Sequence, residues 1–219
     1  MDFQFTPQAL ILLPVILFSI ICHELGHAWV AWRGGDDTAR LAGRITLNPL
    51  AHLDPIGTVV IPVLQLLLHA PLFGWAKPVP VNPLRLRSGR WGVAVSLAGI
   101  GCNVLIALVA VILYKIALVA GVAPAVEHPD PATVGGLIAI MLRGFITLNI
   151  VLALFNLIPI PPLDGSHVLL YFIRTRDNPL FPVFQFLERF GFAIVMVLVL
   201  TRALSLVLWP LLFAVYLVI

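Results

Sequence analysis

Charged side chains are scarce in this chain of 219 residues, where Asp, Glu, Lys and Arg make up 11% and hydrophobic residues 61%. An average soluble domain has about 25% charged and about 45–50% apolar residues. A soluble globule of this length could not bury so much apolar surface. The scarcity therefore excludes a cytosolic enzyme, a nucleic-acid-binding module and a disordered regulator. It indicates a protein surrounded largely by lipid, and the net charge of +3 is too small to indicate a polyanionic partner.

Cysteine is almost absent as well. Cys22 and Cys102 are the only two in the sequence, and both lie inside apolar stretches. We interpret them as small buried hydrophobic residues rather than as a disulfide or a thiolate metal site.

Long uncharged windows are present instead. Five of them approach or exceed the roughly 18–20 apolar residues that cross a bilayer, namely residues 3–23, 55–76, 91–114, 144–163 and 203–219. We expect an all-α polytopic membrane protein with about 4–6 membrane segments in a single domain over residues 1–219. Its core helices are expected at about residues 7–32, 91–120 and 133–173, the last broken at a proline cluster, with a C-terminal helix in one or two pieces at about 184–219.

The positive charges are unevenly distributed. Residues 33–54, 71–90 and 174–189 together contain ten of the 13 Lys and Arg residues, whereas residues 121–132 contain none. Short loops rich in Lys and Arg stay in the cytoplasm. The pattern predicts an integral multi-pass protein of the cell (inner) membrane, with these three segments on the cytoplasmic side.

Two segments between the long helices have their own predictions. Because basic segments flank residues 55–70 on both sides, and Pro62 interrupts them, we expect this stretch to be re-entrant, although a full span is the alternative. Residues 38–47 alternate between polar and apolar in the manner of a strand. This pattern predicts a short β-like hairpin that either has only a structural role or offers an edge to an extended substrate.

The motif His23-Glu24-Leu25-Gly26-His27 lies deep in an apolar stretch. Composition alone gives an expected number of roughly 0.002 chance matches to HExxH, a motif typical of zinc metalloproteases. Residues i and i+4 share a helix face, so both imidazoles can reach one ion, and Glu24 can reach a water molecule beside it. Gly26 leaves the backbone open to a close neighbour. The alternative is a polar contact between helices, although an unpaired Glu at this depth is costly.

A catalytic zinc ion needs a third protein ligand, and Asp164 is the predicted one. It follows the prolines at 159, 161 and 162, and it could also cap the short helix after them. His167 and His52 are the rival ligands. From the charge pattern, the helix of His27 and the helix before Asp164 run in the same direction and bring their ligands to a similar depth, toward the cytoplasmic side.

These motifs resemble the site-2 protease family of intramembrane zinc metalloproteases, in a small form without PDZ or CBS domains. The resemblance covers about residues 8–175 and rests on HELGH at 23–27, RLAGRITLNPLAHLDPIGT at 40–58, GWAKPVPVNP at 74–83, SLAGIGCN at 96–103 and NLIPIPPLDG at 156–165. It implies that His23, His27 and Asp164 bind Zn²⁺. It also implies that Glu24 is the general base.

Two asparagines are candidates for orienting the substrate or stabilising the oxyanion. Asn103 ends a stretch similar to the Gly-Pro-x-x-Asn element of the family, although Ile100 stands in place of the proline. The alternative for Asn103 is a hydrogen bond between helices. Asn156 begins the stretch that leads to Asp164.

The predicted function is hydrolysis of peptide bonds within or near transmembrane segments of membrane-protein substrates. The partners expected are therefore a transmembrane protein and the lipid bilayer. A metal-ion transporter or channel is one alternative, but the spans contain few polar residues to line a path. An inactive protease-like scaffold is another, against which the intact Glu24 argues. Neither the substrate nor the oligomeric state can be read from the sequence.

Overall fold

The computed structural model describes residues 7–61, 63–64, 77–173 and 178–201, and single positions beyond 201. Within these residues every regular element is helical, so the expected all-α fold is confirmed. In this described part of the chain, four helices are long and apolar enough to cross a membrane, namely α1 (Pro7–Arg33), α4 (Gly89–Val119), α5 (Val134–Leu157) and α7 (Phe181–Leu200). The shorter elements are α2 (Thr38–Leu41), α6 (Asp164–Ile173), 3-10 turns at Pro49–His52 and Pro83–Arg85, and a π-helical turn at Pro55–Val60.

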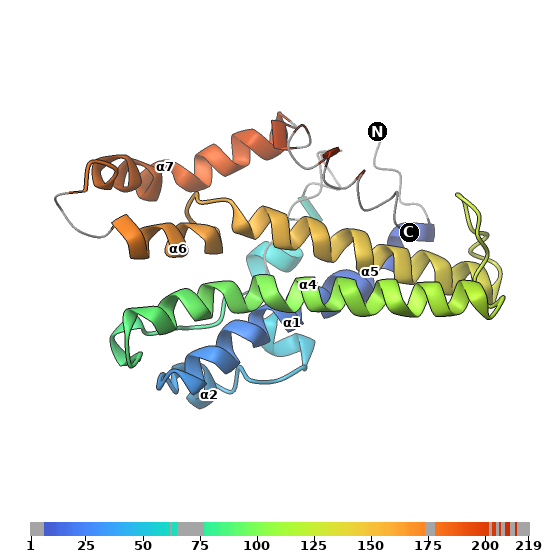
Figure 1. The fold of residues 1–219 in the computed structure, drawn as a ribbon, viewed down its shortest axis with the longest axis horizontal. Coiled ribbons are helices and arrows are strands. Elements are labelled where there is room, and N and C mark those ends of the chain that lie inside the picture. The colour runs from blue at the N-terminus through green and yellow to red at the C-terminus, as the bar shows by residue number, and fades with distance from the viewer. Residues whose placement is uncertain are drawn as a thin grey trace.

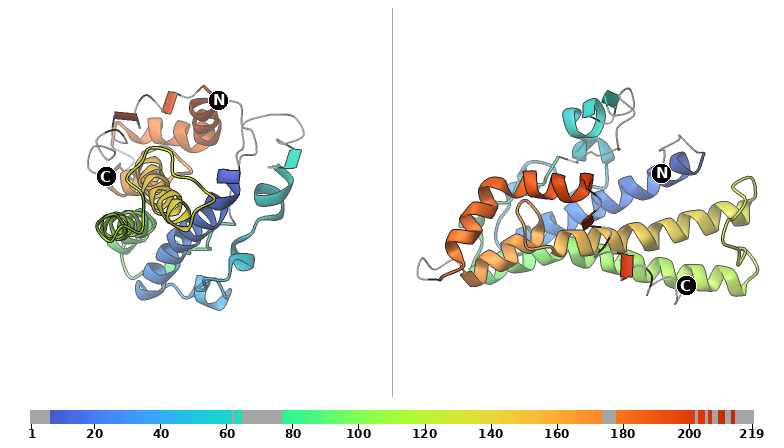
Figure 2. Two further views of the ribbon diagram at one scale, coloured as in Figure 1. Left: turned by 90° about the vertical axis from the view of Figure 1, so that its right-hand side faces the viewer. Right: turned by 90° about the horizontal axis from the view of Figure 1, so that it is seen from above.

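The helix α4 is the centre of the arrangement. It packs against α1, α5 and α6, and α1 also packs against α5. Figures 1 and 2 show α1 and α5 running in the same direction, with α4 antiparallel to both. This is the relative direction that the charge pattern predicts for the helices of His27 and Asn156.

The proline cluster separates α5 from α6. Proline has no backbone N–H to continue a helix, and α5 ends at Leu157, before the prolines at 159, 161 and 162. The turn that follows is closed by hydrogen bonds from Ile160 N–H to the Ile158 carbonyl (2.9 Å) and from Leu163 N–H to the Ile160 carbonyl (3.0 Å). The chain then begins α6 at Asp164, which places this carboxylate at the start of a helix.

The predicted β-like hairpin at residues 38–47 is wrong. Residues Thr38–Leu41 form α2, and no strand is found anywhere in the described part of the chain. The reason is a turn that begins at Asp36, whose carboxylate accepts hydrogen bonds from both the N–H and the hydroxyl of Thr38. Gly43, with φ of 66°, then ends the helix in the left-handed region, and the alternating side chains never pair with a second strand.

The predictions for residues 55–70 and for the C-terminal helix fall only partly within the described residues. The π-helical turn Pro55–Val60 begins the segment predicted to be re-entrant, but residues 62 and 65–76 lie outside the described part, so re-entry stays a prediction. The C-terminal helix α7 spans Phe181–Leu200, whereas the helix expected from the sequence, in one or two pieces, reaches to about residue 219. Directly after α7, Thr201 donates its hydroxyl to the Val197 carbonyl (2.7 Å). Most positions after 201 lie outside the description.

Asp36 fixes the loops at the end of α1. This fully buried carboxylate accepts hydrogen bonds from Thr38 and, through its other oxygen, from the N–H of Asn82 (2.6 Å). Burial alone would raise the pKa of Asp36, but the hydrogen bonds from Thr38 and Asn82, with Arg85 nearby, hold this pKa below its ordinary value. The ionised group therefore ties the segment before α4 to the end of α1.

We expect Asp36→Asn to lower the free energy of unfolding by about 1–3 kcal/mol, because an amide NH2 group would face a backbone N–H donor. The depressed pKa means that the ionised carboxylate stabilises the fold above the unfolded-state value of about 3.9 and loses this effect as the pH falls through the folded-state pKa. The free energy of unfolding of the wild type and of the variant is measured in detergent micelles. The difference between the two values should become smaller below about pH 4.

Asp37→Asn is the matched control for this experiment. Asp37 is exposed and forms an ion pair with Arg85 at 2.6 Å, and exposed pairs contribute about 0–1 kcal/mol. Equal loss of stability in the two variants would contradict the role assigned to Asp36.

Candidate metal centre

His23 and His27 lie on consecutive turns of α1 and face the same way. Their ring centroids are 4.6 Å apart and their Nε2 atoms 3.1 Å apart. The i, i+4 spacing places both imidazoles on one helix face, as the motif predicts. Both residues are buried, with 8% and 9% of their surfaces exposed.

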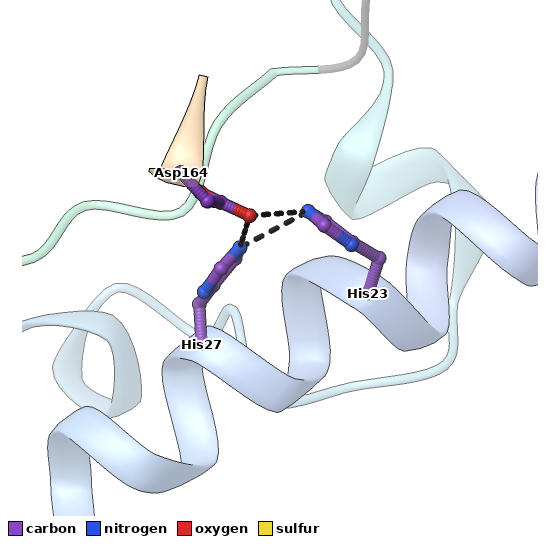
Figure 3. Close-up of side chains that lie close together, drawn as sticks. All are labelled: His23, His27 and Asp164. Carbon is purple, nitrogen blue, oxygen red and sulfur yellow. Dashed lines mark hydrogen bonds and ion pairs between the residues drawn. The ribbon is translucent and has the colours of Figure 1, made fainter. Parts of the chain in front are cut away.

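Asp164 reaches this pair from α6. Its Oδ2 atom lies 3.3 Å from Nε2 of His23 and 3.3 Å from Nε2 of His27. Figure 3 shows the carboxylate pointing between the two rings. Among the residues that the structure describes, this is the group of His, Cys, Asp or Glu side chains that could hold a metal ion, with its ligand atoms within 4.8 Å of one another.

The helix α4 forms the wall behind the two imidazoles. Three successive turns of α4 contact the rings. The carbonyl of Val95 accepts a hydrogen bond from His27 Nδ1 (2.7 Å), and Gly99 lies against both rings. One turn farther along, Asn103 Oδ1 lies 2.6 Å from His23 Nδ1. On the α1 side, a Cβ added at Gly26 would lie 2.9 Å from the Ala98 carbonyl oxygen. The expectation that Gly26 permits a close neighbour is therefore confirmed.

The chemistry of the three facing atoms suits a cation. A carbonyl can only accept, so His27 Nδ1 carries the proton and its Nε2 presents a lone pair to the cluster. Asp164 Oδ2 is buried and has no hydrogen-bond partner within the described structure. Two imidazole nitrogens and one carboxylate oxygen are also the kind of ligand set that a catalytic zinc ion uses, with one position left open.

Glu24, on the turn between the two histidines, is held by a segment far away in the sequence. Its Oε2 atom accepts a hydrogen bond from the N–H of Val79 (2.8 Å). The surrounding segment is fixed at both ends, by Lys77 N–H to the His52 carbonyl (2.9 Å) and by Asn82 N–H to Asp36. Sequence reasoning missed Val79, because a backbone contact across 55 residues leaves no side-chain signal.

The rival ligands lie elsewhere. His167 is exposed on α6 and is not part of the cluster. His52 is buried at the end of the 3-10 turn Pro49–His52, where its Nε2 donates to the Thr46 carbonyl at 2.9 Å and so fixes this part of the chain.

The two candidate asparagines differ in their surroundings. Asn103 is fully buried, and its amide group donates to Asn149 while its oxygen faces His23. This position matches the interhelical alternative, because the side chain has no exposed surface and its amide contacts groups on α1 and α5. Asn156 is only partly buried near the end of α5, and its amide donates to the Leu152 carbonyl at 3.0 Å. The helix α4 continues without interruption through Ile100.

We expect Gly99→Ala to abolish metal binding, because the added Cβ would lie 2.5 Å from His27 Nε2 and 2.6 Å from His23 Cε1. Zinc content of the purified protein, measured by elemental analysis, checks this. Gly101→Ala is the control in the same helix, because a Cβ at Gly101 meets nothing within 4 Å. Normal zinc content in both variants would mean that the metal lies elsewhere.

Comparison with known proteins places this sequence in a family. The sequence profile of Peptidase family M50 matches residues 11–198. The chain is 36% identical over 224 residues to "Putative zinc metalloprotease YwhC" of Bacillus subtilis, which covers 95% of this chain and 90% of that protein. It is 33% identical over 190 residues to "Putative zinc metalloprotease Rip2" of Mycolicibacterium smegmatis, which covers 86% of this chain and 66% of that protein. No solved structure matches the chain significantly. The chain therefore belongs to peptidase family M50, the site-2 proteases, and is an integral membrane peptidase rather than a metal transporter.

Proposed function

We propose that this chain is a zinc-dependent intramembrane endopeptidase that hydrolyses peptide bonds within or near transmembrane segments of membrane-protein substrates. The observation that carries the proposal is the convergence of His23 Nε2, His27 Nε2 and Asp164 Oδ2, with Glu24 next to His23 on the same helix. Membership of a peptidase family and the zinc metalloprotease names of the relatives support it.

In this proposal the zinc ligands are the three residues of the cluster. When bound, zinc supplies a Lewis acid that lowers the pKa of a water molecule and polarises the scissile carbonyl. The hydrogen bond to the Val95 carbonyl keeps His27 in the tautomer that can bind metal. The burial of the cluster keeps the site in a low-dielectric environment, where such charges act strongly.

Glu24 is the proposed general base. Its carboxylate accepts the proton of the attacking water and then gives it to the amine nitrogen that leaves as the peptide bond breaks. The hydrogen bond from the N–H of Val79 fixes the carboxylate in one orientation before the reaction. Asp36 contributes indirectly, because it anchors Asn82 three residues farther along the same segment.

Asn156 is the proposed donor to the oxyanion. One of its amide hydrogens is used by the Leu152 carbonyl, and the NH2 group has a second hydrogen to donate. Its position near the end of α5, shortly before the turn that leads to Asp164, supports this assignment. We do not extend the oxyanion role to Asn103, because Asn103 is fully buried.

The proposed location is the cell membrane, with the site toward the cytoplasm. The three basic segments lie next to the ends of α1, α4 and α7, and short basic loops remain on the cytoplasmic side. His27 is six residues before Arg33, the last residue of α1, or about 9 Å along the helix. Water and a locally unwound substrate would therefore reach the cluster from that side.

We expect Glu24→Gln to reduce cleavage of a transmembrane test substrate by at least about 100-fold, because the amide cannot take up a proton. Zinc content should remain that of the wild type, since the amide oxygen can still accept from the N–H of Val79. Both quantities are measured on the same purified preparation in detergent or liposomes.

Glu188→Gln is the matched control, because it makes the same chemical change at an exposed position of α7. It should cleave at the wild-type rate. Cleavage that persists in Glu24→Gln would contradict the mechanism, and a wild type that holds zinc but cleaves no transmembrane substrate would favour the inactive scaffold.

A further inference from the structure

Four polar side chains form a continuous buried chain between the three core helices. Ser19 on α1, Asn103 on α4 and Asn149 on α5 each have no exposed surface, and the chain ends at His23. Polar groups in an apolar membrane bundle are costly unless they are paired. Asn149 and Ser19 have no part in the proposed reaction, so their burial needs another explanation.

The contacts link each member to the next. The hydroxyl of Ser19 donates to the Val15 carbonyl (2.7 Å), and the amide nitrogen of Asn149 donates to Ser19 Oγ and to the Phe145 carbonyl (2.8 Å each). The amide nitrogen of Asn103 donates to Asn149 Oδ1 at 2.8 Å. Finally, Asn103 Oδ1 lies 2.6 Å from His23 Nδ1.

The Phe145 carbonyl determines which group donates and which accepts in each hydrogen bond between Asn149 and His23. The Phe145 carbonyl can only accept, so the end of the Asn149 side chain that faces it must be the NH2 group. The other end of Asn149 is then an oxygen, which requires the NH2 group of Asn103 to face it. Asn103 must therefore present its oxygen to the imidazole, and His23 Nδ1 must carry a proton.

We propose that Asn149, supported by Ser19, is a positioning residue that acts through Asn103 to fix His23 as the Nδ1-protonated tautomer, with the lone pair of Nε2 facing Asp164 and His27. The inference rests on the proposed zinc site and extends it to residues that touch neither the metal nor the substrate. Two carbonyls of helices α1 and α5 thus determine the state of a ligand in the cluster.

Without the Asn149 side chain, His23 should no longer be held in the Nδ1-protonated tautomer. In Asn149→Leu the NH2 group of Asn103 has no acceptor, so the amide can turn and offer a donor to His23 Nδ1. That nitrogen would then accept, and the proton would move to Nε2, where it blocks metal binding. Partners that orient metal ligands in this way typically change affinity by about 10- to 100-fold.

The test measures two properties of the full-length protein in bilayers or detergent. The first is the zinc dissociation constant, from competition with a chelator of known affinity. The second is the ¹⁵N signal of His23 in the zinc-depleted protein, assigned by its absence in His23→Gln, which distinguishes a proton on Nδ1 from one on Nε2. We expect Asn149→Leu to weaken zinc binding by about 10-fold or more and to show a population of His23 protonated at Nε2.

A matched pair of serines separates positioning from stability. Ser19 and Ser96 are both buried helical serines whose hydroxyls donate to the carbonyl four residues earlier, but only Ser19 also accepts from Asn149. Ser19→Ala should weaken zinc binding less than Asn149→Leu, because the Phe145 carbonyl still orients Asn149. Ser96→Ala should leave both the affinity and the His23 signal unchanged.

The outcomes are distinct. Wild-type zinc affinity and an Nδ1-protonated His23 in Asn149→Leu would overturn the inference. If Asn149→Leu does not fold, the serine pair decides, since equal zinc affinity in Ser19→Ala and Ser96→Ala would overturn it as well. A wild type that binds no zinc would instead refute the proposed function, while the ¹⁵N signal of the metal-free protein would still report on the tautomer.

Discussion

The convergence of His23 Nε2, His27 Nε2 and Asp164 Oδ2 is the contact on which the rest of the structure depends. Three electron-rich atoms lie within 4.8 Å of one another among apolar helices, where burial weakens the screening by water and isolated charges are costly. A cation resolves this repulsion. The helices that bring the atoms together must therefore meet closely, and each ring must present its lone pair inward.

The helix α4 meets both requirements along one face. Gly99 leaves room for both imidazoles because it has no side chain. The Val95 carbonyl contacts Nδ1 of His27, and Asn103 Oδ1 contacts Nδ1 of His23. The base is held from another direction, by the segment that contains Val79 and is anchored at Asn82. The ligands and the base thus depend on separate supports, so that a change in one need not disturb the other.

The sequence predicts the parts of this arrangement that depend on spacing. Length and hydropathy locate α1, α4 and α5, prolines locate the turn before Asp164, and the i, i+4 spacing pairs His23 with His27. It fails where a local side-chain hydrogen bond decides the outcome, as at residues 38–47, where the turn at Asp36 leads into a helix in place of a hairpin. It also cannot predict contacts between distant segments, such as Val79 with Glu24, because these depend on packing that no local pattern records.

X-ray absorption at the zinc edge of the purified full-length protein tests the central claim most directly, since it reports the atoms around the metal without reference to activity. The account predicts a first shell of nitrogen and oxygen at about 2.0–2.2 Å, with imidazole scattering that disappears together with the metal in His23→Gln and His27→Gln. Sulfur at about 2.3 Å would place a cysteine in the shell and contradict the account. An unchanged zinc spectrum in the histidine variants would contradict it equally.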